Sequence, residues 1–288
     1  MIDVDDGGWK PYPLDQPLAA LEVACRGPIA RVTLLGPGKG NAMGPDFWRE
    51  TPLVFRALDA DEEIRAVVVA GSGSHFSYGL DLAAFGPQWS AELAADGGLA
   101  RARTRFRDTV LTLQDSLTAV AECRKPVAAA VSGWCIGGGV DLLAACDVRY
   151  ASAEAQFSIR EVRVAIVADL GSLHRLPGII GEGHLRELAL SGRDIDAAGA
   201  AAIGLVNAVL PTPPEALAAA HRFAEEVAAN PPLVVQGVKE MLNAQRASRI
   251  EEGLRYVAAW NSAFLPSQDL GEAMAAFAER RPPRFTGR

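Results

Sequence analysis

The sequence has few of the features that mark several large classes of protein. It contains only four cysteines, at positions 25, 123, 135 and 146, with neither a CxxC pair nor a Cys/His spacing. This scatter is typical of reduced thiols and not of a disulfide framework or a zinc site, so we expect no bound metal. No apolar run approaches the roughly 18 residues that a membrane-spanning helix needs, so we also expect no membrane partner.

Positive charge is scarce as well. The chain has 28 lysines and arginines against 35 aspartates and glutamates, and its formal net charge is −7. This balance argues against nucleic acid as the main partner, although a local basic patch could still hold an anionic ligand. The first 13 residues are acidic and lack the apolar core of a signal peptide, and the final Thr-Gly-Arg is not the peroxisomal Ser-Lys-Leu address. We therefore expect a cytoplasmic protein.

Residues 125–176 combine an apolar background with glycines and isolated acids. A short apolar run at 127–131, typical of a strand buried on both faces, is followed by the triple glycine 137–139, which opens an apolar helix. Glycines at a helix start allow bare backbone N–H groups to approach a ligand. The stretch therefore predicts a site where backbone donors stabilise an anion.

Three acids lie in the same apolar stretch: Asp141, Glu161 and Asp169. Carboxylates are costly to bury, so their presence among Val, Ile, Ala and Leu indicates acid/base chemistry. Each also has a structural alternative. Asp141 could be an ordinary acid in the first turn of a helix, Glu161 a salt-bridge partner of a neighbouring arginine, and Asp169 the N-cap of the next turn.

Strand and helix patterns alternate up to about residue 210, and only helical patterns follow. The first part contains strand-like runs at 21–25, 29–35, 66–70, 127–131 and 147–151. Its longest helical patterns are 41–59, where Pro52 could mark a break, and 102–123. The last part contains helical patterns at 215–229, 233–246, 250–263 and 267–280. We therefore expect a loose N-terminal arm at 1–20, a core with the active site at 21–211 and a helical region at 212–288.

Five segments of the chain resemble the enoyl-CoA hydratase/isomerase (crotonase) superfamily, and they occur in the order found in that family. They are FSYGLDL at 76–82, CIGGGVDLLAACDVRYAS at 135–152, AQFSIREVRV at 155–164, SGRDIDAAGAAAIGLVNAV at 191–209 and DLGEAMAAFAERRPPRF at 269–285. The resemblance covers roughly residues 22–288. It implies an α/β fold, namely a crotonase-like spiral of ββα units with a C-terminal helical trimerisation region, and hence a homotrimer or hexamer.

The resemblance also implies the substrate and the groups that bind it. The substrate would be an acyl-CoA thioester of fatty acid metabolism, such as β-oxidation, and it would carry its own coenzyme A, so that no further cofactor is expected. The backbone N–H groups of Leu80 and Gly138 would form an oxyanion hole for the thioester enolate. Further contacts with the substrate or its CoA are implied for Tyr78, Gly79, Trp134 and Gly137.

The three acids fall where the Δ3,5-Δ2,4-dienoyl-CoA isomerases carry three acids. Such an enzyme moves a proton between C2 and C6 of the acyl chain, which requires two separated acid/base groups. By resemblance Glu161 lies near C2 as an ionised base, and Asp169 remains as the protonated acid for C6. Hydratases of the family lack an acid at the position of Asp169 and usually carry glutamate at that of Asp141.

The sequence therefore favours an acyl-CoA double-bond isomerase that converts 3,5-dienoyl-CoA to 2,4-dienoyl-CoA. One alternative is an enoyl-CoA hydratase in which Asp141 and Glu161 hold the attacking water. A second alternative, from another class, is a catalytically silent CoA-binding or assembly protein, because one fold hosts many functions.

Overall fold

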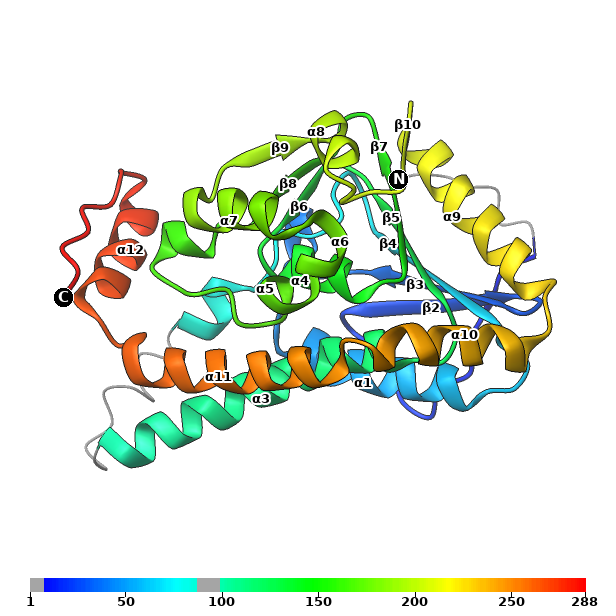
Figure 1. Cartoon of the computed structure of the whole chain (residues 1–288), viewed down its shortest axis with the longest axis horizontal. Helices are drawn as coiled ribbons and strands as arrows, with labels where there is room; N and C mark the ends of the chain where they lie inside the picture. Colours follow the sequence, from blue (N-terminus) through cyan, green and yellow to red (C-terminus); the bar gives the residue numbers. More distant parts are fainter. Residues whose placement is uncertain (1–7, 87–98) are drawn as a thin grey trace.

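The computed structural model describes residues 8–86 and 99–288, and a seven-stranded sheet forms its centre (Figure 1). The strand order is β1-β2-β3-β4-β5-β7-β10. Strands β1 to β3 pair antiparallel, and β3, β4, β5, β7 and β10 run parallel. Their bounds are Lys10–Pro11, Leu21–Arg26, Ile29–Leu34, Ala66–Gly71, Val127–Val131, Val148–Ser152 and Ala208–Leu210.

A second sheet has three short strands: β6 (Trp134–Ile136), β8 (Gln156–Ser158) and β9 (Asp194–Asp196). Strands β6 and β8 are parallel, and β8 and β9 are antiparallel. The pairs β5/β6, β7/β8 and β9/β10 each give one strand to each sheet. The chain therefore winds as a spiral in which each turn adds one strand to each sheet.

Helices cover both faces of the large sheet. On one face, α1 (Pro45–Ala60) packs against α3 (Leu99–Glu122) around a core of large apolar side chains. On the other face, α9 (Pro213–Ala228) lies across β4, β5 and β7. Its Ala220 and Ala224 meet Val68 and Ala128 there, so small residues on both partners allow a close approach.

The elements around the site are short. They are η1 (Gly38–Gly40), α4 (Gly138–Ala145), η2 (Glu161–Val164), α5 (Ser172–Arg175), α6 (Pro177–Ile180), α7 (Glu182–Ser191) and α8 (Ala197–Ala202). Every residue of α4 is buried, which explains why its sequence is apolar on all sides.

The helical tail continues with α10 (Pro232–Ala244), α11 (Ala247–Phe264) and α12 (Gln268–Glu279). Helix α11 lies along α3, and α12 lies at one end of the molecule, where it contacts η2 (Figure 1). The tail therefore folds back onto the spiral, although the boundary expected at residue 211 stays a prediction. No helix in residues 8–86 and 99–288 is long and apolar enough to cross a membrane.

Two local expectations differ from the structure. Pro52 does not break α1, because the carbonyl of Trp48, which loses its helical N–H partner there, accepts a 2.7 Å hydrogen bond from Ser116 Oγ of α3. The described part of the N-terminal arm, residues 8–20, is not loose either. Strand β1 pairs with β2, and the Glu50 carboxylate accepts from the backbone N–H groups of Ala19 and Ala20.

Candidate active site

One cavity of about 490 Å³ brings together most of the residues that the sequence singles out. Seven of the nine predicted site residues line it: Tyr78, Leu80, Trp134, Gly137, Gly138, Glu161 and Asp169. Asp141 is fully buried and does not line the cavity. Gly79 does not line it either, but its backbone packs against Gly138, because a Cβ at Gly79 would lie 2.7 Å from the Gly138 nitrogen.

The N–H groups of Leu80 and Gly138 lie side by side in the cavity wall. A Cβ at Gly138 would lie 3.4 Å from the Leu80 nitrogen, and Gly137 and Gly79 adopt φ angles of +52° and +77° that favour glycine. Neither N–H has an acceptor in the part of the chain that the structure describes. Since Gly138 is also the first residue of α4, the helix dipole adds to this donor pair. The pair can therefore stabilise an oxyanion.

The three acids approach the cavity from different elements. Asp141, in the first turn of α4, accepts a 2.5 Å hydrogen bond at Oδ1 from the backbone N–H of Ser172. Glu161 begins η2, and a Cβ at Gly137 would lie only 3.3 Å from its Oε1. Asp169 lies in the loop before α5. Asp141 Oδ2 and Glu161 Oε2 are buried without a hydrogen-bond partner in the described residues, so both can accept a proton or a water.

Burial raises the pKa of all three carboxyl groups. It raises the pKa of Glu161 most, to about 8, and the charges of Asp141 and Asp169 add to the increase. It raises the pKa of Asp169 to about 7, partly offset by a hydrogen bond from Asn261, and that of Asp141 to about 6, offset by the bond from Ser172. Near neutral pH, Asp141 is therefore the most readily ionised of the three acids, and Glu161 holds its proton most tightly.

This order differs from the expectation of a resting enzyme with Glu161 ionised and Asp169 protonated. The apolar surroundings of Asp169 suggested that it alone would hold a proton. In the structure Glu161 is equally enclosed, and the charges of Asp141 and Asp169 raise its pKa further, whereas a hydrogen bond from the Asn261 amide stabilises ionised Asp169. Glu161 therefore holds a proton more tightly than Asp169 does.

The structural alternatives do not hold for Glu161 and Asp169, whereas Asp141 does lie in the first turn of a helix. Arg160 forms an ion pair of 2.6 Å with Asp194, and Arg163 approaches the same carboxylate at 3.8 Å, so neither pairs with Glu161. The residue that caps α5 is Gly171, which leaves Asp169 free of a capping role. Its Oδ2 instead accepts a 2.7 Å hydrogen bond from Asn261 Nδ2 of α11.

Several residues around the site escaped the sequence analysis. Asn261 and Gln114 reach the Asp169 loop from α11 and α3, and Gln114 Nε2 donates to the Asp169 carbonyl at 2.6 Å. The buried guanidinium of Arg175 donates to the Leu170 carbonyl at 3.3 Å. The arginine between two leucines in the segment SLHRL could have marked Arg175 from the sequence. No local pattern marks Asn261 or Gln114.

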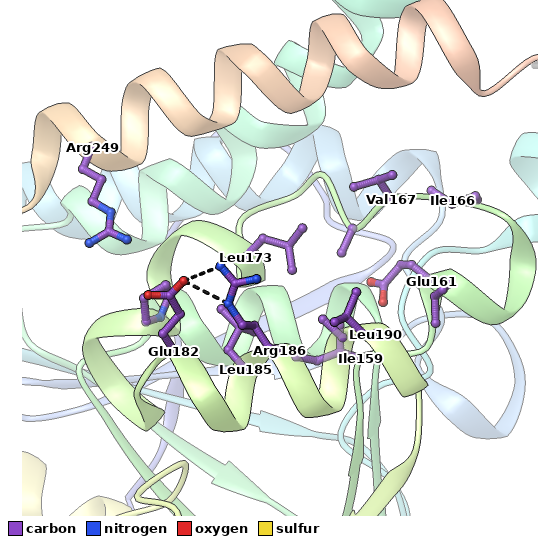
Figure 2. Close-up of a pocket in the computed structure, with 14 residues that line it drawn as sticks. Ile159, Glu161, Ile166, Val167, Leu173, Glu182, Leu185, Arg186, Leu190 and Arg249 are labelled. Carbon is purple, nitrogen blue, oxygen red and sulfur yellow. Dashed lines mark hydrogen bonds and ion pairs between the residues drawn. The ribbon is translucent and has the colours of Figure 1, made fainter.

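A second cavity, of about 340 Å³, shares Glu161 and Ile166 with the first (Figure 2). Its walls are mainly apolar and include Ile159, Ile166 and Leu173. Figure 2 shows the Glu161 carboxylate directed into this space from η2, with the Glu182–Arg186 ion pair of α7 farther along the wall. Apolar walls on this side explain part of the high pKa of Glu161.

The fold is a crotonase-type spiral, and its cavity presents two neighbouring backbone N–H groups and the carboxyl groups of Glu161 and Asp169. The family model that describes enoyl-CoA hydratase/isomerase matches residues 25–288, and the chain belongs to this family of enzymes. Both the resemblance and the expected α/β spiral fold are therefore confirmed.

Comparison with individual relatives is more specific than the family match. It is 42% identical over 249 residues to the peroxisomal Δ(3,5)-Δ(2,4)-dienoyl-CoA isomerase of Arabidopsis thaliana, covering 86% of this chain and 89% of that protein. It is 39% identical to the human mitochondrial Δ(3,5)-Δ(2,4)-dienoyl-CoA isomerase, covering 88% and 77%. A crystal structure of an enoyl-CoA hydratase from Mycobacterium avium subsp. paratuberculosis K-10 matches with a TM-score of 0.80 at 26% identity, covering 94% of this chain and all of the other.

These relatives contradict the cytoplasmic localisation expected from the sequence. The Arabidopsis relative is peroxisomal, and the Dictyostelium discoideum and human relatives are mitochondrial. The expectation was wrong because it rested on the absence of two address signals, and an absent signal carries no information about where a protein resides.

Proposed function

We propose that this protein isomerises 3,5-dienoyl-CoA to 2,4-dienoyl-CoA through a dienolate held in the oxyanion hole. The observation that carries the proposal is Asp169, a third carboxyl group that lines the same cavity as Glu161. Simple addition of water needs acid/base groups at neighbouring carbons only. A proton shift from C2 to C6 needs a second group farther along the acyl chain, and Asp169 supplies it. The naming of the 42% identical Arabidopsis relative agrees with this function.

The thioester carbonyl oxygen would accept hydrogen bonds from the N–H groups of Leu80 and Gly138. Tyr78, Trp134 and Gly137 would contact the CoA or the acyl chain from the same cavity wall. In this pose the negative charge of the dienolate develops on the carbonyl oxygen, where the two donors are already in place. Such preorganised donors typically contribute about 3–4 kcal/mol each to transition-state stabilisation.

The movement of protons in this reaction assigns a role to Glu161 and to Asp169. Glu161 takes the proton from C2, and the electron pair of that C–H bond enters the conjugated system and reaches the carbonyl oxygen. The charge returns to C6, which takes a proton from Asp169, so the double bonds move from positions 3 and 5 to positions 2 and 4. Each turnover leaves Glu161 protonated and Asp169 ionised, and one proton must return before the next. No electron leaves the substrate, so we propose that no cofactor takes part.

The competent protonation state therefore has Glu161 ionised and Asp169 protonated. Because burial gives Glu161 the higher pKa, Glu161 must lose its proton before it can act as the base. Asp141 is the most acidic of the three groups, and its negative charge raises the pKa of both Glu161 and Asp169, so it helps these groups to hold protons.

An absorbance assay with 3,5-dienoyl-CoA and 2-enoyl-CoA side by side tests the proposal. Isomerisation of the dienoyl substrate with little hydration of the enoyl substrate is the expected result. Faster hydration of 2-enoyl-CoA would favour the second candidate, a hydratase, which is supported by the two unpartnered oxygens Asp141 Oδ2 and Glu161 Oε2 that could hold a water. Tight CoA thioester binding without either reaction would favour a silent CoA-binding protein.

We further propose that the chain assembles as a homotrimer or hexamer through its helical tail. Helix α10 exposes a row of large apolar side chains: Leu233, Val234, Val238, Met241 and Leu242. Such a patch marks an interface in most soluble proteins. Light scattering should show a trimer or hexamer for the parent and for Glu240→Gln, and dissociation for Leu233→Glu combined with Met241→Glu. A monomeric parent at micromolar concentration would contradict this assembly.

A further inference from the structure

The loop that carries Asp169 is held by side chains and not by its own backbone. Residues 165–171 connect η2 to α5, and among the described residues no backbone–backbone hydrogen bond involves positions 167–170. Three of these four carbonyls accept hydrogen bonds from side chains instead: that of Val167 from Asn261, that of Asp169 from Gln114 and that of Leu170 from Arg175. Because a backbone carbonyl that is removed from water needs another donor, these side chains decide where the loop lies.

Gln114 connects the backbone of Asp169 to two long helices. It lies in α3 and is only 4% exposed. Its Nε2 donates to the Asp169 carbonyl at 2.6 Å and to the Leu254 carbonyl of α11 at 3.1 Å. An amide nitrogen carries two hydrogens, so both are used. Since α11 lies along α3, the loop is anchored where these two helices meet (Figure 1).

Asp169 is thereby fixed at two points. Asn261 donates to its carboxylate Oδ2 at 2.7 Å, and Gln114 donates to its main-chain carbonyl. The contact with Asn261 orients the carboxyl group. The contact with Gln114 holds the backbone from which that group reaches the cavity wall.

Glu161 is positioned in a different way. It begins η2, and its own carbonyl accepts a 3.1 Å hydrogen bond from the N–H of Ile166, five residues along the chain. Gln114 makes no hydrogen bond to residues 161–164 in the part of the chain that the structure describes, and it does not line the cavity. Loss of the Gln114 amide should therefore displace Asp169 and leave Glu161 and the oxyanion donors in place.

We propose that Gln114 is a positioning residue that holds the Asp169 carboxyl group within reach of C6 of the acyl chain. Proton transfer requires the donor to lie within hydrogen-bond distance of the atom it protonates, and a displacement of about 1 Å can cost about 100-fold in rate. The inference rests on the proposed isomerase function and extends it to a buried residue that does not touch the substrate.

The rates of isomerisation and of C2 exchange provide the first test. Gln114→Met keeps an unbranched side chain of similar length and removes both donors. Isomerisation of 3,5-dienoyl-CoA should fall about 10- to 100-fold. Exchange of the C2 hydrogen with deuterated solvent should stay near the parent rate, because it needs only Glu161 and the oxyanion hole. An equal loss of both reactions, or parental isomerisation, in folded Gln114→Met would overturn the proposal.

Ser116→Ala is the matched control. It removes a buried hydrogen bond from the same helix, which Ser116 Oγ donates to the Trp48 carbonyl at 2.7 Å, away from the Asp169 loop. Both rates should stay near the parent values in this variant. If Gln114→Met does not fold, Gln114→Asn takes its place. It keeps a buried amide but is shorter by one methylene, so it cannot bridge both carbonyls and should give the same separation of the two rates.

Backbone hydrogen exchange separates this inference from the proposed function, because it needs no turnover. The peptide spanning residues 165–175 includes the Ser172 N–H, which is held by Asp141 Oδ1. Exchange of this peptide, followed by mass spectrometry, should be faster in Gln114→Met and unchanged in Ser116→Ala. Equal exchange in the parent and Gln114→Met would refute the role of Gln114 even if the enzyme isomerises dienoyl-CoA. Faster exchange in Gln114→Met of a parent that lacks isomerase activity would support the anchor and reject the isomerase assignment.

Discussion

Asn261 Nδ2 donates a 2.7 Å hydrogen bond to Asp169 Oδ2, and the same amide donates to the Val167 carbonyl at 2.8 Å. The helical tail thereby holds the loop that carries the second acid/base group. Since the hydrogen bond favours the ionised form of Asp169, the tail also adjusts the acidity of the site. Packing of the tail against the Asp169 loop and chemistry in the cavity are therefore physically connected.

Replacing Asn261 should change both stability and pH dependence. Asn261→Ala removes the donor that lowers the pKa of Asp169, so Asp169 stays protonated to higher pH and the falling alkaline limb of kcat/KM should move to higher pH. The unpaired Val167 carbonyl should cost about 1–3 kcal/mol of unfolding free energy, measured with urea.

Asn243→Ala provides a matched control for this change. It removes an amide that donates to the Ala121 carbonyl at 3.1 Å, from the same tail but away from the cavity. This variant should lose stability and keep the parent pH profile. An Asn261→Ala enzyme with an unmoved alkaline limb would contradict the link to Asp169.

A hydrogen-exchange experiment should distinguish the role of Glu161 from that of Asp169. Asp169→Asn keeps the shape of the side chain but cannot deliver a proton to C6, so isomerisation should stop. Exchange of the C2 hydrogen with deuterated solvent needs only Glu161 and the oxyanion hole, and it should survive in this variant. Glu161→Gln should lose both, as measured by mass spectrometry of the recovered substrate. Near-parental isomerisation by Asp169→Asn would make a hydratase or simpler isomerase the better account.

Loss of one oxyanion donor should lower kcat strongly. Gly138→Pro removes the N–H that faces the cavity; proline is tolerated at the first position of a helix, although a Cβ there would lie 3.2 Å from Met43 Sδ, so that side chain must shift. The expected loss in kcat is about 100- to 1000-fold. Gly183→Ala, where a Cβ would meet open space, serves as the control and should keep parental kcat. Circular dichroism must show a folded variant, and a folded Gly138→Pro enzyme with parental kcat would exclude Gly138 from the oxyanion hole.

Stability should fall as pH rises through the pKa values of the buried acids. A carboxyl group whose pKa is higher in the folded protein than in the unfolded chain binds its proton more tightly when folded. Its stabilising contribution is complete below the unfolded pKa and is lost as pH rises through the folded value. The ordinary pKa values of 3.8 to 4.5 and the raised values of about 6, 7 and 8 place this loss between about pH 4 and pH 8.

Glu161→Gln should therefore stabilise the protein at alkaline pH. The gain is on the order of 1 kcal/mol for each unit of raised pKa, less the screening by water that reaches the cavity. Thermal unfolding at pH 6 and pH 9 measures it, and the exposed Glu240→Gln should show no such gain. An equal melting temperature for Glu161→Gln and the parent at pH 9 would show that ionisation of Glu161 does not destabilise the folded protein.

The amino-acid sequence was sufficient for the features that local patterns encode. The strand 127–131 and the glycines 137–139 were readable because a strand buried on both faces and a glycine-opened helix have characteristic residues. The three acids were conspicuous because carboxylates are rare in apolar stretches. Four helices after residue 212 followed from their periodicity, and they are α9 to α12 in the structure.

Tertiary structure decided the charge state of the site. The pKa of a carboxyl group depends on burial and on neighbours within a few ångströms, and those neighbours come from distant parts of the chain. Asn261 lies 92 residues from the aspartate it contacts, and Asp194 lies 34 residues from the arginine it fixes. No local pattern records such pairs, so the sequence identified the three acids but not which one holds the proton.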